Sequence, residues 1–273
     1  MVFFNLMRDY HLHTSYCRHA YGEMSDFIES AIENGMVEIC FTDHIPLPDG
    51  FDSSHRMAME DMEKYVGQLR KLRQMYPEIS ILIGIEADYI EGYEKFIEEF
   101  TSLYSLDLVI MSVHFIKDWP NNQWVFSFSY TEETLPKIYH EYFTAMYRGI
   151  KTGLFDVVGH MDLIKRPNHP VLETNREDIE MILDAVHRQK MSIEINTSGL
   201  RKTIAETFPA PGIVEMAVKR GITMTLGSDS HIPPQVGFQF EDVLRETGKF
   251  PGLKLARYQK RKVAGVEMPV FMG

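Results

Sequence analysis

Short apolar runs rich in valine and isoleucine alternate with longer amphipathic stretches along the whole chain. Seven of these runs are candidates for strands, at residues 6–14, 37–44, 79–89, 106–115, 154–162, 191–198 and 222–231. Their lengths and their β-branched residues are typical of buried strands in a parallel sheet. We therefore predict seven parallel strands, each separated from the next by a segment long enough for a crossover helix.

The intervening segments carry the signals of helices. In residues 25–36, Phe27, Ile28, Ala31 and Ile32 recur at helical spacing, and Gly35 is a typical helix stop. Four further helices are predicted at residues 60–77, 135–153, 176–190 and 211–221. This alternation predicts an α/β fold with a parallel sheet or barrel. Because the chain has no GxGxxG or GxxxxGKS/T motif, we favour a seven-stranded (β/α)7 barrel, formed by a single domain over residues 1–273.

Composition and charge narrow the function classes. The chain has 273 residues, 44% hydrophobic and 25% charged, with a formal net charge of −11. A surface this acidic repels a phosphate backbone, so we expect no nucleic-acid partner. No apolar run reaches the ~20 residues of a membrane helix, and the apolar start is too short for a signal peptide. Cys17 and Cys40 form no CxxC pair, so we expect no disulfide framework and a cytoplasmic location.

Polar residues of the kinds that bind metals stand at the carboxyl end of every apolar run. They are His11, His13, Asp43, His44, Glu86, Asp88, His114, His160, Asp162, Glu194, Asn196, Asp229 and His231. In a parallel barrel these ends form one face, where active sites lie. Residues two apart in a strand share a side, so His11 and His13 form a pincer for a divalent metal. The other histidines, His55, His140, His169 and His187, fall in predicted loops or helices, and we expect no metal role for them.

Taken together, the motifs resemble those of the polymerase and histidinol phosphatase family, called PHP. The resemblance rests on HLH (11–13), His19, DH (43–44), Glu86, SVH (112–114), GH (159–160) and SDSH (228–231). It is strongest for the histidinol-phosphate phosphatase branch, because DYHLHTSYCRHA is followed by GE, a predicted helix and FTDHIPLP. The resemblance covers nearly the whole chain.

The resemblance implies a distorted barrel of seven parallel strands that holds up to three divalent metal ions, which could be zinc, iron or manganese. By motif position, the first metal would be bound by His11, His13, Glu86 and Asp229. Glu86 would bridge to the second metal, which His114 and His160 complete. The third would be bound by His19, His44 and His231. All nine positions carry the residue type that the family uses.

This ligand set suits the hydrolysis of a phosphate ester. Seven neutral imidazoles and two carboxylates contribute a charge of only −2 against the +6 of three divalent ions. We expect a metal-bridging hydroxide to attack phosphorus in line, with a small-molecule monoester as substrate and L-histidinol phosphate as the favoured one. The alternatives are another phosphorylated metabolite, nucleic-acid ends, or a metal-binding module without turnover. The general acid and the oligomeric state stay unassigned.

Arginines just past two strand ends are candidates for binding the phosphate. Arg166 in GHMDLIKRPNH and Arg201 in INTSGLRK are the stronger candidates, and Arg18 beside His19 is the weaker one. Further neighbours are considered only for supporting roles. Asn196, Ser228, Asp43 and Asp162 are expected to orient ligands or substrate, Cys17 is a minor ligand candidate, Cys40 a core residue, and Trp119 and Trp124 either line the pocket or pack their loop.

Overall fold

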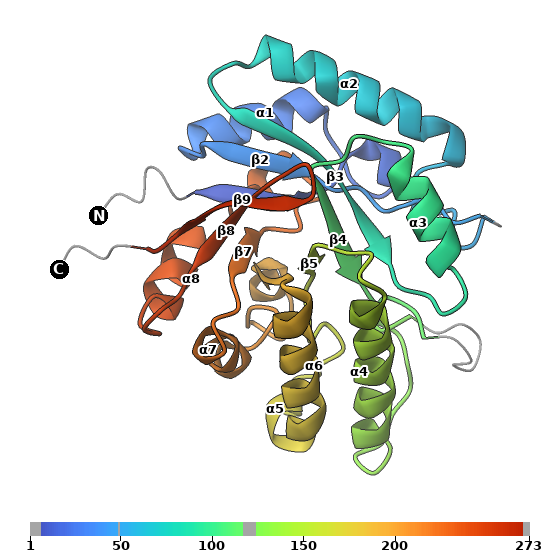
Figure 1. Ribbon diagram of the computed structural model, residues 1–273, viewed down its shortest axis with the longest axis vertical. Helices are drawn as coiled ribbons and strands as arrows, with labels where there is room; N and C mark the ends of the chain where they lie inside the picture. The colour runs from blue at the N-terminus through green and yellow to red at the C-terminus, as the bar shows by residue number, and fades with distance from the viewer. Residues whose placement is uncertain (1–6, 49, 117–123, 270–273) are drawn as a thin grey trace.

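A computed structural model describes residues 7–48, 50–116 and 124–269 (Figure 1). Nine strands form one sheet and follow one another in chain order. They are β1 (Arg8–Leu12), β2 (Glu38–Phe41), β3 (Ser80–Asp88), β4 (Leu108–Ser112), β5 (Val157–Val158), β6 (Ser192–Asn196), β7 (Met224–Gly227), β8 (Leu255–Gln259) and β9 (Lys262–Glu267). Neighbours from β1 to β8 pair in parallel, and β9 pairs antiparallel with β8. The fold is therefore α/β with a mostly parallel sheet.

Helices surround this sheet. They are α1 (Met24–Glu33), α2 (Met62–Met75), α3 (Glu94–Ser102), α4 (Leu135–Thr152), α5 (Val171–Thr174), α6 (Arg176–Gln189), α7 (Pro211–Lys219) and α8 (Phe240–Thr247). Figure 1 shows α1 and α2 above the sheet, α3 beside it, and α4 to α7 below. The five predicted helices are confirmed as α1, α2, α4, α6 and α7. Three further helices, α3, α5 and α8, lie outside the segments predicted to be helical.

The seven predicted strands are also confirmed, but the C-terminal pair β8 and β9 was not predicted. The reason is compositional, because β9 is largely exposed and lacks a continuous apolar run. Lys260 and Arg261 form the turn between the two strands with positive φ angles of 50° and 61°. Such a half-exposed hairpin gives a weaker sequence signal than a buried parallel strand.

Backbone hydrogen bonds bring the end of β1 beside the segment that follows β7. His13 N donates to Ser230 O over 3.0 Å, and Ser230 N donates to His11 O over 3.3 Å. The beginning and the later part of the chain are thus joined at the carboxyl ends of their strands. This contact places the predicted metal ligands of both segments at one location.

Burial explains why the strands occupy these positions. Every residue of β1, β2, β4, β5, β6 and β7 is buried. One side of the sheet packs on the helices, and a smaller cluster that includes Tyr10, Leu108 and Tyr258 lies apart from that core. Cys40 belongs to this smaller cluster and is fully buried, as predicted. Among the described residues, no helix has the length and apolar character needed to cross a bilayer.

Candidate metal centre

The nine predicted ligands converge at the carboxyl ends of the strands. Ligand atoms lie within 4.8 Å of one another in overlapping groups, including His11–His13–Asp229, His11–Glu86–His160, His13–His44–Glu86 and His19–His44–His231. Because parallel strands all end at the same edge, six of the seven strands from β1 to β7 deliver these side chains to one place, at their ends or after them. The clustering expected from the sequence is therefore present in the fold.

Glu86 of β3 lies at the centre of the cluster. Its Oε2 is 2.9 Å from His44 Nδ1 and 3.3 Å from His11 Nε2. Its Oε1 is 2.8 Å from His160 Nε2 and 3.8 Å from His114 Nε2. The two oxygens thus face two different groups of imidazoles, which is the arrangement that a bridging carboxylate requires.

Asp229 joins the cluster from the segment after β7. Its Oδ1 lies 3.3 Å from His13 Nε2. Asp229 has a φ of 52°, in the left-handed region that aspartate adopts more readily than most residues. This backbone turn directs the carboxylate toward β1 while the chain continues to His231, so one short segment supplies two candidate ligands.

His19 and His231 form a close pair at the edge of the cluster. Their Nε2 atoms are 2.8 Å apart. The Nδ1 of His19 lies 2.8 Å from the carbonyl oxygen of Cys17, and the Nδ1 of His231 lies 3.1 Å from that of Asp229. A carbonyl only accepts hydrogen bonds, so each Nδ1 carries the proton. Each Nε2 then presents a lone pair to the other, an arrangement that a cation stabilises.

Unpaired buried atoms show that a divalent metal fits this donor set. Within the described residues, four buried atoms have no partner with the geometry of a hydrogen bond, even though two of them, His44 Nδ1 and Glu86 Oε2, lie close together: His11 Nε2, His13 Nε2, His44 Nδ1 and Glu86 Oε2. Buried polar atoms without partners are uncommon in folded proteins and need an explanation, such as an ion. Imidazole nitrogens and carboxylate oxygens are donors that zinc, iron and manganese accept.

The electrostatics of the cluster divide its histidines. Burial disfavours the charged forms of His11 and His13, but nearby carboxylates outweigh burial and hold the pKa of both well above the usual value, so a metal ion would have to displace their protons on binding. Burial raises the pKa of Glu86, but His44, His11 and His114 outweigh it and hold that pKa well below its usual range. Burial lowers the pKa of His44 to about 3. Burial also lowers the pKa of His231 well below its usual value. An ionised carboxylate and neutral imidazoles are the forms that bind metal ions.

Asp43 and Asp162, the two acidic candidates for supporting roles, have different kinds of partner. Asp43 accepts a hydrogen bond from Thr14 N at 2.9 Å and lies 3.6 Å from Nδ1 of His13, a predicted ligand. Asp162 accepts a hydrogen bond from Ala210 N at 2.9 Å and forms an ion pair with Lys165, so we assign it a structural role.

The remaining candidates lie closer to the cluster. Asn196 Nδ2 donates to Glu194 Oε2 at 3.1 Å, and Ser228 N donates to Asp9 Oδ1 at 2.9 Å. Cys17 is buried, with its sulfur in a potential ligand group with His13 and His231.

A cavity of about 430 Å³ opens onto the cluster. Its walls include His19, His44, Glu86, His114, Asp229 and His231, together with Asp52, His55, Arg56, Trp124, Phe126, Ser198, Arg201, Lys202 and Gln235. Arg201 Nη2 donates to the carbonyl oxygens of Ser228 at 2.8 Å and Asp229 at 3.0 Å. Its Nη1 is buried and has no partner. Arg201 thus has a fixed guanidinium with a donor to spare at the cavity wall.

The structure does not bring Arg166 or Arg18 to this wall. Arg166 donates to the carbonyl oxygens of Ile164 at 2.9 Å and Val125 at 2.5 Å, and its guanidinium lies 4.1 Å from the Phe128 ring centroid. Arg18 donates to the carbonyl oxygen of Ser53 at 2.7 Å. Backbone carbonyls bind both side chains, and neither arginine lines the cavity.

The wall of the cavity that contains His55 was not predicted from the sequence. His55, which was assigned to a polar loop, has its Nδ1 2.7 Å from Asp52 Oδ1. Its ring centroid lies 4.3 Å from that of Trp124 and 5.4 Å from that of His19. Of the two alternatives for Trp124, it lines the pocket. Trp119 falls outside the described residues. His55 stands far from any strand end, so no strand pattern indicates its position.

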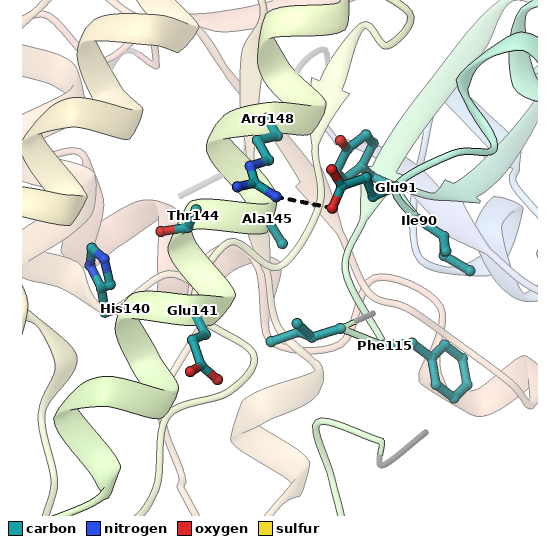
Figure 2. Close-up of a pocket in the computed structure, with 10 residues that line it drawn as sticks. Ile90, Glu91, Phe115, His140, Glu141, Thr144, Ala145 and Arg148 are labelled. Carbon is teal, nitrogen blue, oxygen red and sulfur yellow. Dashed lines mark hydrogen bonds and ion pairs between the residues drawn. The ribbon is translucent and has the colours of Figure 1, made fainter. Parts of the chain in front are cut away.

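A second cavity, of about 350 Å³, lies between the β3–α3 loop and α4. Figure 2 shows Arg148 of α4 reaching across to Glu91, and the two side chains form an ion pair at 3.0 Å. His140, which lines the same cavity, pairs with Asp178 at 2.8 Å. None of the nine predicted metal ligands lines this cavity.

Two known proteins are similar to this chain over most of its length. A probable histidinol-phosphatase of Deinococcus radiodurans is 36% identical over 256 residues, covering 93% of this chain and 97% of that protein. The histidinol-phosphatase of Bacillus subtilis is 30% identical over 265 residues, covering 87% of this chain and 98% of that protein.

Solved structures add the likeness in fold. A histidinol phosphate phosphatase of Lactococcus lactis, solved with zinc, L-histidinol and phosphate, superposes with a TM-score of 0.81. It is 23% identical, and the match covers 94% of this chain and 98% of that one. The sequence model of the PHP domain matches residues 9–198. The chain therefore belongs to the PHP domain family.

Proposed function

We propose that this chain is a phosphatase that hydrolyses L-histidinol phosphate to L-histidinol and phosphate. The names of the D. radiodurans and B. subtilis relatives support this substrate, as does the L-histidinol and phosphate bound to the L. lactis protein. The observation that carries the proposal is the cavity of about 430 Å³, which has six of the nine predicted ligands and Arg201 on its walls. A role in histidine biosynthesis in the cytoplasm follows from that substrate.

We further propose that up to three divalent ions bind the cluster. One would be held by His11, His13, Glu86 and Asp229, a second by Glu86, His114 and His160, and a third by His19, His44 and His231. Bound there, such ions make hydroxide available near neutral pH and neutralise charge on the phosphoryl oxygens. The zinc in the L. lactis complex supports zinc as one of these ions.

The side chains of the cavity would orient the ester. Arg201 has a free Nη1 with which to donate to a phosphate oxygen, and its other nitrogen is already fixed by two carbonyls. Lys202, beside it in the chain, adds positive charge at the same wall. His55 and Trp124 form the wall that would face the alcohol part. Arg166 and Arg18 also donate to backbone carbonyls but do not line the cavity, so Arg201 is the strongest of the three arginine candidates.

We also propose that the strands β1 to β7 form a distorted seven-stranded barrel of the PHP type, in a single domain. The hydrogen bonds between the end of β1 and Ser230 support this closure.

A phosphate-release assay on protein loaded with zinc, manganese or iron tests the proposed activity. Among a panel of phosphorylated metabolites and nucleotides, we expect L-histidinol phosphate to be hydrolysed fastest. A chelator and the His11→Ala substitution should each abolish release. Faster hydrolysis of another ester would assign a different metabolite, and the absence of any release would overturn the phosphatase proposal.

A further inference from the structure

We infer that Glu194 is a positioning residue that sets the orientation of His11 and the placement of His160. This inference rests on the proposed metal cluster and extends it to β6, the one strand from β1 to β7 that supplies none of the nine predicted ligands at or after its end. Glu194 is 1% exposed and lies outside the cavity wall. A buried carboxylate in such a place needs partners for both of its oxygens.

Both oxygens of Glu194 have partners among the ligand-bearing segments. Its Oε1 is 2.6 Å from His11 Nδ1. Its Oε2 accepts from the backbone N of His160 at 2.8 Å and from Asn196 Nδ2 at 3.1 Å. One side chain of β6 therefore connects β1, which carries His11, to the segment after β5, which carries His160.

The contact fixes which nitrogen of His11 carries the proton. A carboxylate only accepts hydrogen bonds, so the Nδ1 of His11 must donate to Glu194. The Nε2 of the neutral ring is then unprotonated, and it faces Glu86 Oε2 at 3.3 Å without a hydrogen bond. Since a metal binds the unprotonated nitrogen, Glu194 keeps His11 in the form that can be a ligand.

Gly227 of β7 provides the space for this carboxylate. A Cβ at position 227 would overlap Glu194 Oε1, and it would lie 2.8 Å from both Glu194 Cδ and His11 Cβ. No side chain can occupy this position unless Glu194 or His11 moves. Gly227 lies opposite Asn196 in the register of β6 and β7, two positions along from Glu194, and its missing side chain leaves room for the Glu194 carboxylate.

Glutamine at position 194 cannot satisfy the same partners. If its oxygen accepts from His160 N and Asn196, its amide group faces His11 Nδ1, and the ring must carry its proton on Nε2 instead. If its oxygen accepts from His11, the amide group faces the N–H of His160 and two donors oppose each other. Either arrangement weakens metal binding, at the proposed site that contains His11 or at the one that contains His160.

Zinc titration of the metal-free full-length chain, in competition with a chromophoric chelator, tests the inference. We expect E194Q to weaken zinc binding at two of three sites by about 10- to 100-fold, the usual effect of removing a partner of a ligating histidine. The site of His19, His44 and His231 should keep its affinity, because Glu194 contacts none of the three. G227A should weaken zinc binding at the same two sites, although the Glu194 carboxylate itself is chemically intact in that variant.

E38Q is the matched control. Glu38 is also a buried carboxylate, 3% exposed, but it pairs with Tyr10 and Ser80 at the opposite end of the strands. We expect E38Q to lower the thermal midpoint without changing zinc affinity, so a general loss of stability is separated from a loss of ligand orientation.

Two outcomes would contradict the inference, and they differ. Normal zinc affinity in E194Q, beside a wild-type chain that binds zinc, would overturn the positioning role alone. A wild-type chain that binds no zinc would overturn the metal cluster of the proposed function, and the positioning role with it.

Discussion

The Nε2 atoms of His19 and His231 lie 2.8 Å apart although the two residues are separated by 212 positions in the chain. Each ring has its other nitrogen against a backbone carbonyl oxygen, so both Nε2 lone pairs are directed to the same place. Two fixed lone pairs in contact repel each other unless a cation or a proton lies between them. The pair therefore predicts a separate metal position at the mouth of the cavity.

Replacing His19 with alanine should remove that metal alone. We expect the variant to bind one zinc fewer per chain than the wild type. The contacts of Glu86 with His44 and His160 do not involve His19 and should be retained. Elemental analysis of the zinc-loaded protein measures the difference. His187→Ala, on the exposed side of α6, is the control and should retain the full metal content. Unchanged zinc in His19→Ala would argue against a third site.

Arg201→Lys should raise KM more than it lowers kcat. The substitution removes the planar guanidinium at the cavity wall, whose buried Nη1 has no partner among the described residues, and a hydrogen bond to a charged group contributes ~1.5–3 kcal/mol. This corresponds to an increase in KM for L-histidinol phosphate of about 10- to 100-fold. Steady-state kinetics test this, with Arg245→Lys, an exposed arginine of α8 paired with Asp242, as the control. A normal KM would remove Arg201 from the phosphate contacts.

Trp124→Ala should change substrate preference. Its ring packs against His55 in the cavity wall, and contacts between aromatic rings contribute ~0.5–1.5 kcal/mol beyond burial. We expect kcat/KM for L-histidinol phosphate to fall by about 2- to 10-fold, and that for glycerol phosphate, which has no ring, to change less. Equal losses for both esters would show that Trp124 supports the wall without contacting the alcohol part.

Arg56→Met should destabilise the whole chain. Arg56 is 2% exposed, and its Nη2 lies 2.5 Å from Oδ2 of the fully buried Asp88. Removing one partner of a buried ion pair leaves a charge without compensation and costs about 3–5 kcal/mol. Urea denaturation measures the loss. Because Asp88 also accepts from His114 Nδ1 at 2.9 Å, the Arg56→Met, Asp88→Asn double variant should recover stability but not metal affinity.

The sequence was informative where local pattern and function coincide. Residues such as His11 and Glu86 stand at the ends of buried apolar runs, and parallel topology brings those ends together whatever the details of the helices. The strand positions follow from the same runs, which is why all seven predicted strands are present, but each strand is shorter than its run, and β5 spans only Val157–Val158 of the run 154–162.

Other parts depend on contacts that no local pattern records. His55 reaches the cavity from a long loop and is held there by Asp52 and Trp124. Arg166 has the right distance from a strand end, but the carbonyl of Val125, 41 positions away, binds its guanidinium. The role inferred for Glu194 depends on a glycine on the next strand, which only the sheet register reveals.

The backbone contact between the end of β1 and Ser230 also bears on how the protein matures. His11 and His13 are synthesised more than two hundred positions before Asp229 and His231. A nascent chain that ends before β7 lacks one of the four ligands proposed for the first metal, one of the three proposed for the third, and the support that Ser230 gives to β1. If the cluster binds metal as proposed, its loading is completed only late in biogenesis, once the sheet is complete.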